Sequence, residues 1–550
     1  MSSRKSWVDF RLKERKVGNL PSGGDPLWAL VYPEGYEVGM ANLGVHSVYR
    51  ALRERGVAAE RFFKSPFPDI SVENDRPISD FRLLTASVVY EPDMTSLLSM
   101  LKKWTIPATW LEREEKDGPI LGVGGGISYI NPLGLSKYAD FIALGDGEEI
   151  FDHLVDAVRD FFRHHGKRRR LWETLAENAS FFVPPIHLEQ LVKGRPLSRK
   201  KSICLDLSAA AGKSTWITPR SVFPDSFLVE TQRGCYRKCP FCTIPACFGP
   251  PRTRPKDLVL KDIGAAKEHG ALRLGIIAPE SGDYPWISDV IATVRQQDFS
   301  VSFASLRLDS LTPEMLEVLS QSGQRTLTVA PETGDDELRK KCGKPFTQKL
   351  IIEKLKVARE KGITKTKMYF MLGLPSETVE HVLETARFIS LVRRETGLNT
   401  VASFSIFVPK PQTPWQDKEF SSPETIETRT KLLRKNLLKT GTSGVELRFP
   451  SYREAEEEYN LAWCLADSDL AFTRKEKARH DTILVKRNWN FWDSKEISRI
   501  EVKGCEHAKR TKIQGTPVDL FLRPYHAAAR RPARTGSSHS RRAPSVLPDT

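Results

Sequence analysis

Residues 230–242 read Glu230-Thr-Gln-Arg-Gly-Cys235-Tyr-Arg-Lys-Cys239-Pro-Phe-Cys242, and the apolar run Phe227-Leu228-Val229 comes directly before them. Three cysteines therefore lie within eight residues, which lets one short loop surround a metal centre. Thiolates are soft ligands that suit iron–sulfur clusters or zinc. A closed zinc site or an electron-transfer cluster takes four protein ligands, whereas three leave one metal position open. The stretch therefore predicts a reactive metal centre.

The pattern Cys-x3-Cys-x2-Cys, with Phe241 before the last cysteine, resembles the signature of the radical S-adenosylmethionine (SAM) superfamily. The resemblance implies a [4Fe–4S] cluster held by Cys235, Cys239 and Cys242. Its fourth iron would chelate the amino and carboxylate groups of SAM, and Phe241 would lie near the adenine. One electron from the cluster would then cleave SAM into methionine and a 5′-deoxyadenosyl radical that abstracts hydrogen. A zinc knuckle is the alternative interpretation of the three cysteines.

The bulk composition bounds the class of protein. The chain has 550 residues, of which 40% are hydrophobic and 28% charged, and this predicts a soluble globular protein of two to four domains. No apolar run approaches the roughly 18 residues that a membrane span needs, and the amino terminus lacks a signal-peptide core. Eight cysteines are too few and too unevenly placed for a disulfide framework. We expect a cytoplasmic protein with no membrane partner.

The net charge of +15 is a weak argument for nucleic acid as a partner. About a third of this excess lies in the arginine-rich residues 523–550, and two short basic runs, 167–170 and 199–201, add to it. A basic patch is only an electrostatic footprint until a binding module accompanies it, and the sequence shows no such module. A nucleic-acid substrate is therefore possible but not favoured.

The first half of the chain alternates apolar runs with amphipathic segments. The runs 27–32, 83–90, 120–123 and 141–144 are predicted strands, and 44–55, 94–104 and 150–161 are predicted helices. This alternation predicts an α/β domain with a doubly wound parallel sheet. Glycines that follow such strands lie at their carboxyl ends, where open α/β sheets bind ligands.

This half resembles the cobalamin-binding-type domain fused to the amino terminus of many radical SAM enzymes. The resemblance implies that ligand-facing positions are Ser87, Gly124, Gly125, Gly126, Gly145 and Gly147. The family's histidine ligand to cobalt, within Asp-x-His-x-x-Gly, has no counterpart in residues 36–44. His46 lies nearby but out of register, and a lone helical histidine is more often a core or surface residue than a ligand. Cobalamin would have to bind without a protein ligand to cobalt, or the domain would be a scaffold.

The second half repeats the alternation of strand and helix. Strands are predicted at 226–232, 272–278, 300–305, 326–331, 366–372 and 402–408. Six such units predict a partial (β/α)6 barrel of the TIM type, which the superfamily resemblance also implies. Function in parallel barrels lies at the carboxyl ends of strands.

The resemblance extends to the carboxyl ends of these strands. Glu280, after the second strand, occupies the slot of the family's Gly-Gly-Glu motif that binds the amino group of SAM, although the paired glycines are missing. Ser305 ends the third strand and is a further candidate for cofactor binding. Glu332 and Arg339 follow the fourth strand and resemble the segment that contacts the ribose and carboxylate of SAM. The alternative is that Glu332 and Arg339 only cap or pair at a helix start.

These observations divide the chain into six parts. They are a flexible amino terminus at 1–24, the cobalamin-binding-like domain at 25–165, a linker at 166–222, the radical SAM barrel at 223–440, a small helical carboxyl-terminal region at 441–522 and a disordered basic tail at 523–550.

Three functions remain open. The first is a radical SAM enzyme that acts on an unactivated carbon, with cobalamin-assisted methyl transfer weakly favoured. The second is a radical SAM enzyme without cobalamin that performs rearrangement, oxidation or RNA modification. The third is a non-catalytic iron–sulfur or zinc protein. Methylthiotransferases hold an auxiliary cluster through three amino-terminal cysteines, and residues 1–203 contain none. An enzyme of this kind also needs an electron donor such as flavodoxin or ferredoxin.

Overall fold

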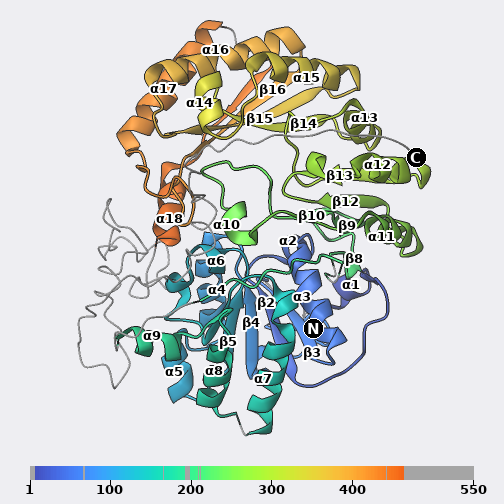
Figure 1. Ribbon diagram of the computed structural model, residues 1–550, viewed down its shortest axis with the longest axis vertical. Coiled ribbons are helices and arrows are strands. Elements are labelled where there is room, and N and C mark those ends of the chain that lie inside the picture. The colour runs from blue at the N-terminus through green and yellow to red at the C-terminus, as the bar shows by residue number, and fades with distance from the viewer. Residues whose placement is uncertain are drawn as a thin grey trace, which may run out of the picture.

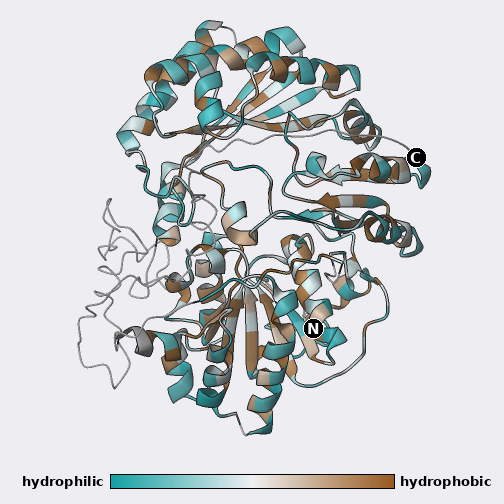
Figure 2. Cartoon of the chain, in the orientation of Figure 1, coloured by the Kyte–Doolittle hydropathy of each residue, from teal (hydrophilic) through white to brown (hydrophobic). Residues whose placement is uncertain are grey.

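The computed structural model describes residues 7–65, 69–164, 166–192, 199–208, 210, 212–440 and 443–463. The first α/β unit lies below the second in Figure 1, and helix α10 lies between them. In both units apolar strands are covered by helices whose outer surfaces are polar (Figure 2). No helix in the described ranges is long and apolar enough to cross a membrane.

The first unit is built on one six-stranded sheet. Its strands, in the spatial order β3-β2-β4-β5-β6-β7, are Ala58–Phe63, Leu27–Tyr32, Leu83–Ser87, Ile120–Gly124, Phe141–Ala143 and Phe181–Phe182. All neighbours are parallel except β6 and β7. Because β2 pairs with both β3 and β4, the strand order reverses there, as in doubly wound folds. The doubly wound parallel sheet is confirmed.

Both faces of this sheet are covered. Alternate residues along a strand point to opposite faces, so Ala29 and Val31 enter the core beneath α4 (Glu91–Lys103), while Trp28 and Leu30 enter the other core. The helices of that second face are α3 (Leu43–Glu54), α7 (Phe151–Arg163) and α8 (Arg168–Glu177). Residues 166–192, within the range where we expected a linker, supply α8, α9 (Pro184–Val192) and β7 to this unit.

Strand β3 was not predicted from the sequence. Its central residues are Glu60 and Arg61, and charged residues rarely occupy a buried strand. Both are buried because they are paired: Arg61 with Glu14 and Glu73, and Glu60 with Arg76.

The second unit contains all six predicted strands, in two parallel sheets. One has the order β13-β12-β9, with bounds Ser300–Phe303, Arg273–Ile277 and Ser226–Glu230. The other has the order β14-β15-β16-β17, with bounds Thr326–Glu332, Lys365–Leu372, Asn399–Ile406 and Val445–Arg448. No ladder joins β13 to β14 in this described stretch, so a continuous barrel sheet remains a prediction.

Helices follow the strands of the second unit. They are α11 (Lys256–Glu268), α12 (Ile287–Gln296), α13 (Pro313–Gln321), α14 (Asp336–Lys341), α15 (Gln348–Glu360), α16 (Val379–Thr396) and α17 (Pro423–Thr440). Side-chain oxygens of Thr312, Asp335 and Thr347 accept backbone N–H groups at the starts of α13, α14 and α15. Such caps satisfy donors that the helix itself leaves free.

Short elements complete the description. They are α1 (Val8–Arg11), α2 (Tyr36–Gly39), α5 (Trp110–Glu115), α6 (Ile127–Ile130), α9 (Pro184–Val192) and the two-stranded pair of β1 (Arg15–Lys16) with β8 (Trp216–Ile217).

Helix α18 (Tyr452–Ala462) ties the two units together beside α4 and β16 (Figure 1). Lys410, at the exit of β16, lies 2.5 Å from Glu91 of the first unit and 2.6 Å from Glu458 of α18. The indole of Trp463 donates to the carbonyl of Pro409. Residues 464–550, which include the rest of the predicted helical region and the predicted tail, lie outside the described residues.

Candidate active site

The cysteines lie on a loop, residues 234–243, that we call the cysteine loop. It leaves β9 through a hairpin in which β10 (Gln232–Arg233) pairs antiparallel with β11 (Arg252–Thr253). Helix α10 (Ile244–Phe248) follows the loop within this hairpin. Gly234 has a φ of +73°, and a Cβ there would lie 2.6 Å from the carbonyl oxygen of Pro250. Because only glycine fits this closure, the hairpin fixes the start of the loop.

All three cysteines are free thiols and half-buried. Burial raises the pKa of Cys235 and raises the pKa of Cys242 to about 11, and the neighbouring cysteines act in the same direction. Metal binding would displace these protons, because thiolates are the ligands. In the part of the chain that the structure describes, no three His, Cys, Asp or Glu side chains could hold one metal ion together. A [4Fe–4S] cluster does not require this, because its cysteines ligate different irons.

Two neighbouring segments hold the cysteine loop. Gly343, after α14, has a φ of +78°, and a Cβ there would lie 2.9 Å from the Cα of Cys239. On the β16 side, the backbone N–H of Trp415 donates to the carbonyl of Pro240 at 3.0 Å. The Phe241 ring lies 6.2 Å from the Trp415 ring and packs against buried apolar residues. The loop is therefore held from both sides of the second unit.

A charged network lies beside the loop. Arg307 donates to both oxygens of Asp309, at 3.0 and 3.1 Å, and its Nη1 lies 3.7 Å from the Sγ of Cys239. Arg237, inside the loop, forms a two-point ion pair with Asp283 at 2.9 and 2.6 Å. A cation held this close to a sulfur stabilises negative charge on it.

Glu280 lies at the carboxyl end of β12 with one oxygen unsatisfied. Its Oε1 accepts from the Ser310 hydroxyl at 2.7 Å and from the backbone N–H of Gly282 at 3.1 Å. Its Oε2 is buried and has no hydrogen-bond partner among the described residues. Burial raises the pKa of Glu280. Buried polar atoms normally find partners, so this oxygen is free to accept from a ligand ammonium.

Glu332 ends β14 at an irregularity in the ladder and has a φ of +66°. Its carboxylate accepts from Lys344, whose ammonium also donates to the carbonyl of Ala330 at 2.7 Å. Burial raises the pKa of Glu332, and Lys344 opposes this rise. A non-glycine residue in the left-handed region stores strain, which is common at binding sites.

The two units meet at the hairpin that carries the cysteine loop. Arg233 pairs with Asp146 at 3.2 Å and with Glu148 at 3.0 Å, and Arg252 pairs with Asp146 at 2.5 Å. Asp146 and Glu148 belong to the turn 145–149 at the carboxyl edge of the first sheet. That edge therefore faces the cysteine loop.

Comparison with known families agrees with this geometry. Residues 229–389 match the model of the radical SAM superfamily, and residues 44–184 match the model described as radical SAM proteins, N-terminal. The chain belongs to the radical SAM superfamily. It is thus a radical SAM enzyme, and each of the two described units contains most of one matched range.

Individual relatives are distant. An uncharacterised protein of Methanocaldococcus jannaschii is 26% identical over 418 residues, which are 74% of this chain and 83% of that protein. A tRNA-2-methylthio-N(6)-dimethylallyladenosine synthase of Thermus thermophilus is 23% identical over 33% of this chain and 40% of its own. Among solved structures, the radical SAM methyltransferase TsrM from Kitasatospora setae has a TM-score of 0.48 at 15% identity, covering 71% of this chain and 77% of its own.

Arg339, which the resemblance assigned to SAM, lies inside the turn that follows Glu332. It is fully buried and donates to the carbonyls of Thr333, Gly334 and Phe346 at 2.7, 2.8 and 3.0 Å. It also pairs with Asp336 on the same helix. Its guanidinium therefore stabilises the turn after Glu332, while its buried Nε has no hydrogen-bond partner among the described residues, and contact with SAM stays a prediction. Helix α14 points Arg339 inward, which the sequence did not reveal.

The other predicted positions of the second unit lie at strand ends. Ser305 is exposed just beyond β13, and its carbonyl accepts from the backbone N–H of Ser281 at 3.1 Å. The structure thus brings Glu280 and Ser305 together at neighbouring strand ends.

The glycines predicted to face cobalamin are mostly packed against the protein. A Cβ at Gly125 would overlap the carbonyl of Val88, one at Gly145 would overlap Ser202, and one at Gly147 would meet the Phe151 ring. Gly126 accepts a weak hydrogen bond from the Cys247 thiol at 3.6 Å. Ser87 and Gly124 end adjacent strands and are half-buried.

His46 is a core residue, as expected for a lone helical histidine. Its Nδ1 accepts from the backbone N–H of Thr215 at 2.9 Å, and its Nε2 lies 3.1 Å from the carbonyl of Met40. Burial lowers its pKa to about 3. Neither ring nitrogen is free to ligate cobalt.

Sequence reasoning missed two residues of this radical SAM site, Arg307 and Lys344. The sequence placed Arg307 in the segment after the third strand but gave it no role. Its partner Cys239 is 68 positions away, so no local pattern links the two residues. Lys344 follows Gly343 directly, and a glycine after a short helix is a signal of a tight turn that can present the next side chain.

Proposed function

We propose that this radical SAM enzyme holds a [4Fe–4S] cluster through Cys235, Cys239 and Cys242 and uses it to cleave SAM. The observation that carries the proposal is the three-cysteine loop, which follows β10; Gln232 of β10 donates to the backbone carbonyl of Glu280, the residue with the unsatisfied carboxylate oxygen. When bound, the cluster supplies the electron that splits SAM into methionine and a 5′-deoxyadenosyl radical.

The chain's own residues would bind and orient the reactants. The three thiols lose their protons on loading, and Arg307 stabilises the negative charge that then lies on Cys239. The Oε2 of Glu280 would accept a hydrogen bond from the ammonium group of SAM. This acceptor has no partner among the described residues, and the new hydrogen bond would be charge-assisted. Lys344, which follows the Gly343 that contacts Cys239, pairs with Glu332 at the end of β14 and so adds a polar pair next to the loop.

The test is formation of 5′-deoxyadenosine after anaerobic reconstitution with iron and sulfide, followed by SAM and dithionite. We expect the wild type to form it and Cys239→Ala to form none. Cys204→Ala is the matched control, because Cys204 is a buried free cysteine outside the loop and should leave the product unchanged. Equal product in the Cys239→Ala protein would refute the assignment of the cluster ligands.

The reaction that consumes the radical is a separate proposal. Cobalamin-assisted methyl transfer is supported by the reversal of strand order in the first sheet and by Ser87 and Gly124 at its carboxyl edge. The fit is incomplete, because His46 is occupied and the 145–149 turn is bound to Arg233 and Arg252. Cobalamin bound here would receive no ligand from His46.

The ion pairs of the 145–149 turn favour the second candidate, a cobalamin-independent radical SAM reaction in which the first unit is a scaffold. Corrinoid content after expression in cells supplied with cobalamin separates the two. About one corrinoid per chain supports methyl transfer, and a cobalamin-free protein that still forms 5′-deoxyadenosine supports the scaffold role. Transfer of a methylthio group is disfavoured, since residues 1–203 contain no cysteine for an auxiliary cluster.

A flavodoxin or ferredoxin is the proposed electron donor. Tyr236, which is 53% exposed, and the exposed Lys238 of the cysteine loop offer it an aromatic and basic surface.

A further inference from the structure

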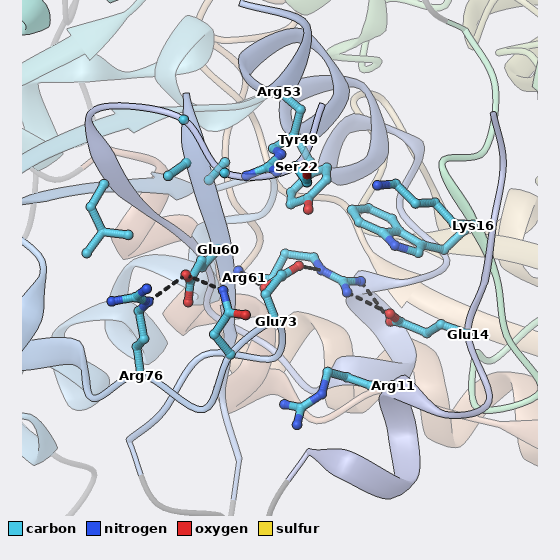
Figure 3. A pocket seen from close by; sticks show the side chains of 17 residues that line it. Arg11, Glu14, Lys16, Ser22, Tyr49, Arg53, Glu60, Arg61, Glu73 and Arg76 are labelled. Atoms are coloured by element: carbon cyan, nitrogen blue, oxygen red, sulfur yellow. Dashed lines mark hydrogen bonds and ion pairs between the residues drawn. The ribbon is translucent and has the colours of Figure 1, made fainter. Parts of the chain in front are cut away.

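The first unit contains a pocket of about 470 Å³ that lies apart from the cysteine loop. It runs along the amino-terminal half of the edge strand β3, from Ala58 to Arg61, and reaches the start of β2 at Leu27 (Figure 3). The carboxyl edge of the same sheet faces the cysteine loop, so the pocket opens elsewhere on the domain. Its volume is within the usual range for small-molecule sites.

Of the 17 residues that line the pocket, five are cationic and three are anionic. Most of them are paired. Arg61 is fully buried and forms ion pairs with Glu14 at 2.8 Å and Glu73 at 2.5 Å. Glu60 pairs with Arg76 at 3.1 Å. These pairs neutralise one another and build a rigid wall.

Two cations remain without a carboxylate partner. The side-chain ammonium of Lys16 has no hydrogen-bond or ion-pair partner among the described residues, and its pKa is lowered first by partial burial and then by Arg53 and Arg50. Arg53 is 9% exposed and donates only to the carbonyl of Pro21, while its buried Nε has no partner in the described ranges. Lys16 and Arg53 lie on either side of Tyr49 in Figure 3, and they are close enough for Arg53 to lower the pKa of Lys16.

The pocket is accessible at this end. Ser22, Gly23 and Gly24 form its rim and are exposed. Gly23 has a φ of +72°, and no atom lies within 4 Å of the position a Cβ would take. An anion binds favourably where two cations repel each other and a guanidinium N–H lacks an acceptor. Both conditions hold here, and the exposed rim gives the anion access to the pocket.

We propose that this pocket binds the phosphate group of a small phosphorylated molecule, with Lys16 and Arg53 as its ligands. The negative charge of the phosphate would offset the repulsion between the two cations. One of its oxygens would accept a hydrogen bond from the Nε of Arg53. The remaining volume, walled by Tyr49 and Leu27, would hold the organic part of the ligand. The site is independent of the radical SAM site.

Calorimetric titration of the full chain with inorganic phosphate and with ribose 5-phosphate tests the proposal. We expect one saturable site per chain, with ribose 5-phosphate bound more tightly than phosphate. Lys16→Gln should weaken binding about tenfold or more, because a charge-assisted hydrogen bond is lost. Lys16→Glu should abolish binding. Lys16 is exposed, so neither variant should alter the unfolding midpoint.

Lys13→Gln is the matched control, because Lys13 is an exposed lysine on the same segment that pairs with Asp9 outside the pocket. It should bind both probes like the wild type, and so should Cys239→Ala. The proposal is overturned if no saturable binding occurs up to about 10 mM ligand. It is equally overturned if Lys16→Gln and Lys13→Gln have the same effect, since binding would then be non-specific surface attraction.

Discussion

At the scale of single residues, Arg307 joins the cysteine loop to the end of β13. Its guanidinium is held by Asp309 and lies 3.7 Å from Cys239 Sγ. A reduced cluster carries one more negative charge than an oxidised one, so a fixed cation beside a ligand sulfur favours reduction.

Replacing Arg307 should therefore change the redox behaviour of a bound cluster. We expect Arg307→Gln to lower its reduction potential by about 60 mV, which corresponds to a tenfold change in a one-electron equilibrium. Potentiometric titration followed by EPR measures this directly. Arg307→Lys keeps the charge and should retain most of the wild-type potential. Equal potentials in the wild type and Arg307→Gln would contradict the electrostatic role.

The carboxyl group of Glu377 should make the stability of the fold depend on pH. It is buried after β15, accepts from the backbone N–H of Gly373 at 2.8 Å and pairs with Arg429 at 2.8 Å. Burial raises the pKa of Glu377 to about 7, against an ordinary value of 4.5. Since the folded-state pKa is raised, the protonated carboxyl stabilises the fold. This contribution is complete below the ordinary value and is lost as pH rises through about 7.

Glu377→Gln should remove this pH dependence. Relative to the variant, we expect the wild type to lose up to about 3 kcal/mol between roughly pH 4.5 and pH 7. The unfolding midpoints of both proteins, compared over that range, measure the loss. A constant difference between the two midpoints would show that Glu377 has an ordinary pKa.

At the scale of elements, the cysteine loop depends on the turn after α14. Gly343 contacts the Cys239 backbone, so Gly343→Ala should displace the loop and reduce iron incorporation at least severalfold. Gly323→Ala is the matched control, because its φ of +83° imposes similar backbone strain with no atom within 4 Å. Iron per chain after anaerobic reconstitution is the measurement. Equal loading of the two variants would refute the role of this contact.

The elements also show what the sequence could predict. The strands ending near Glu280, Ser305 and Glu332 were predicted because each is a short apolar run followed by a helix. Strand β3 was missed because the ion pairs that bury Glu60 and Arg61 come from distant residues.

The residues of the candidate site also fall into a group that the sequence predicted and a group that it did not. The cysteines were found because their spacing is local in sequence. Three other features depend on how helices and strands pack, which the spacing of residues in the sequence does not encode. They are the inward direction of Arg339, the contact of Arg307 with Cys239 and the ion pair of Glu332 with Lys344.

At the scale of the whole molecule, the first unit supports the cysteine loop through Asp146. This carboxylate pairs with Arg252 and Arg233 and accepts from the backbone N–H of Cys204 at 2.9 Å. Removing one partner of a buried ion pair leaves an uncompensated charge.

Asp146→Asn should therefore destabilise the hairpin by about 3 kcal/mol or more. We expect faster amide hydrogen exchange across residues 232–253 and lower cluster occupancy. Asp152→Asn, at an exposed ion pair with Arg55 in the same unit, should change neither. Unchanged exchange in Asp146→Asn would mean that the two units fold and load independently.

The cysteine loop is proposed to hold a cluster with one iron open to SAM. The most direct measurement is the EPR spectrum of the reconstituted, dithionite-reduced protein with and without SAM, since it requires no knowledge of the final substrate. We predict a [4Fe–4S]⁺ signal whose g values shift when SAM is added, and a weaker shift in Glu280→Gln. A full cluster whose spectrum is identical with and without SAM, or zinc bound in place of iron, would contradict the claim.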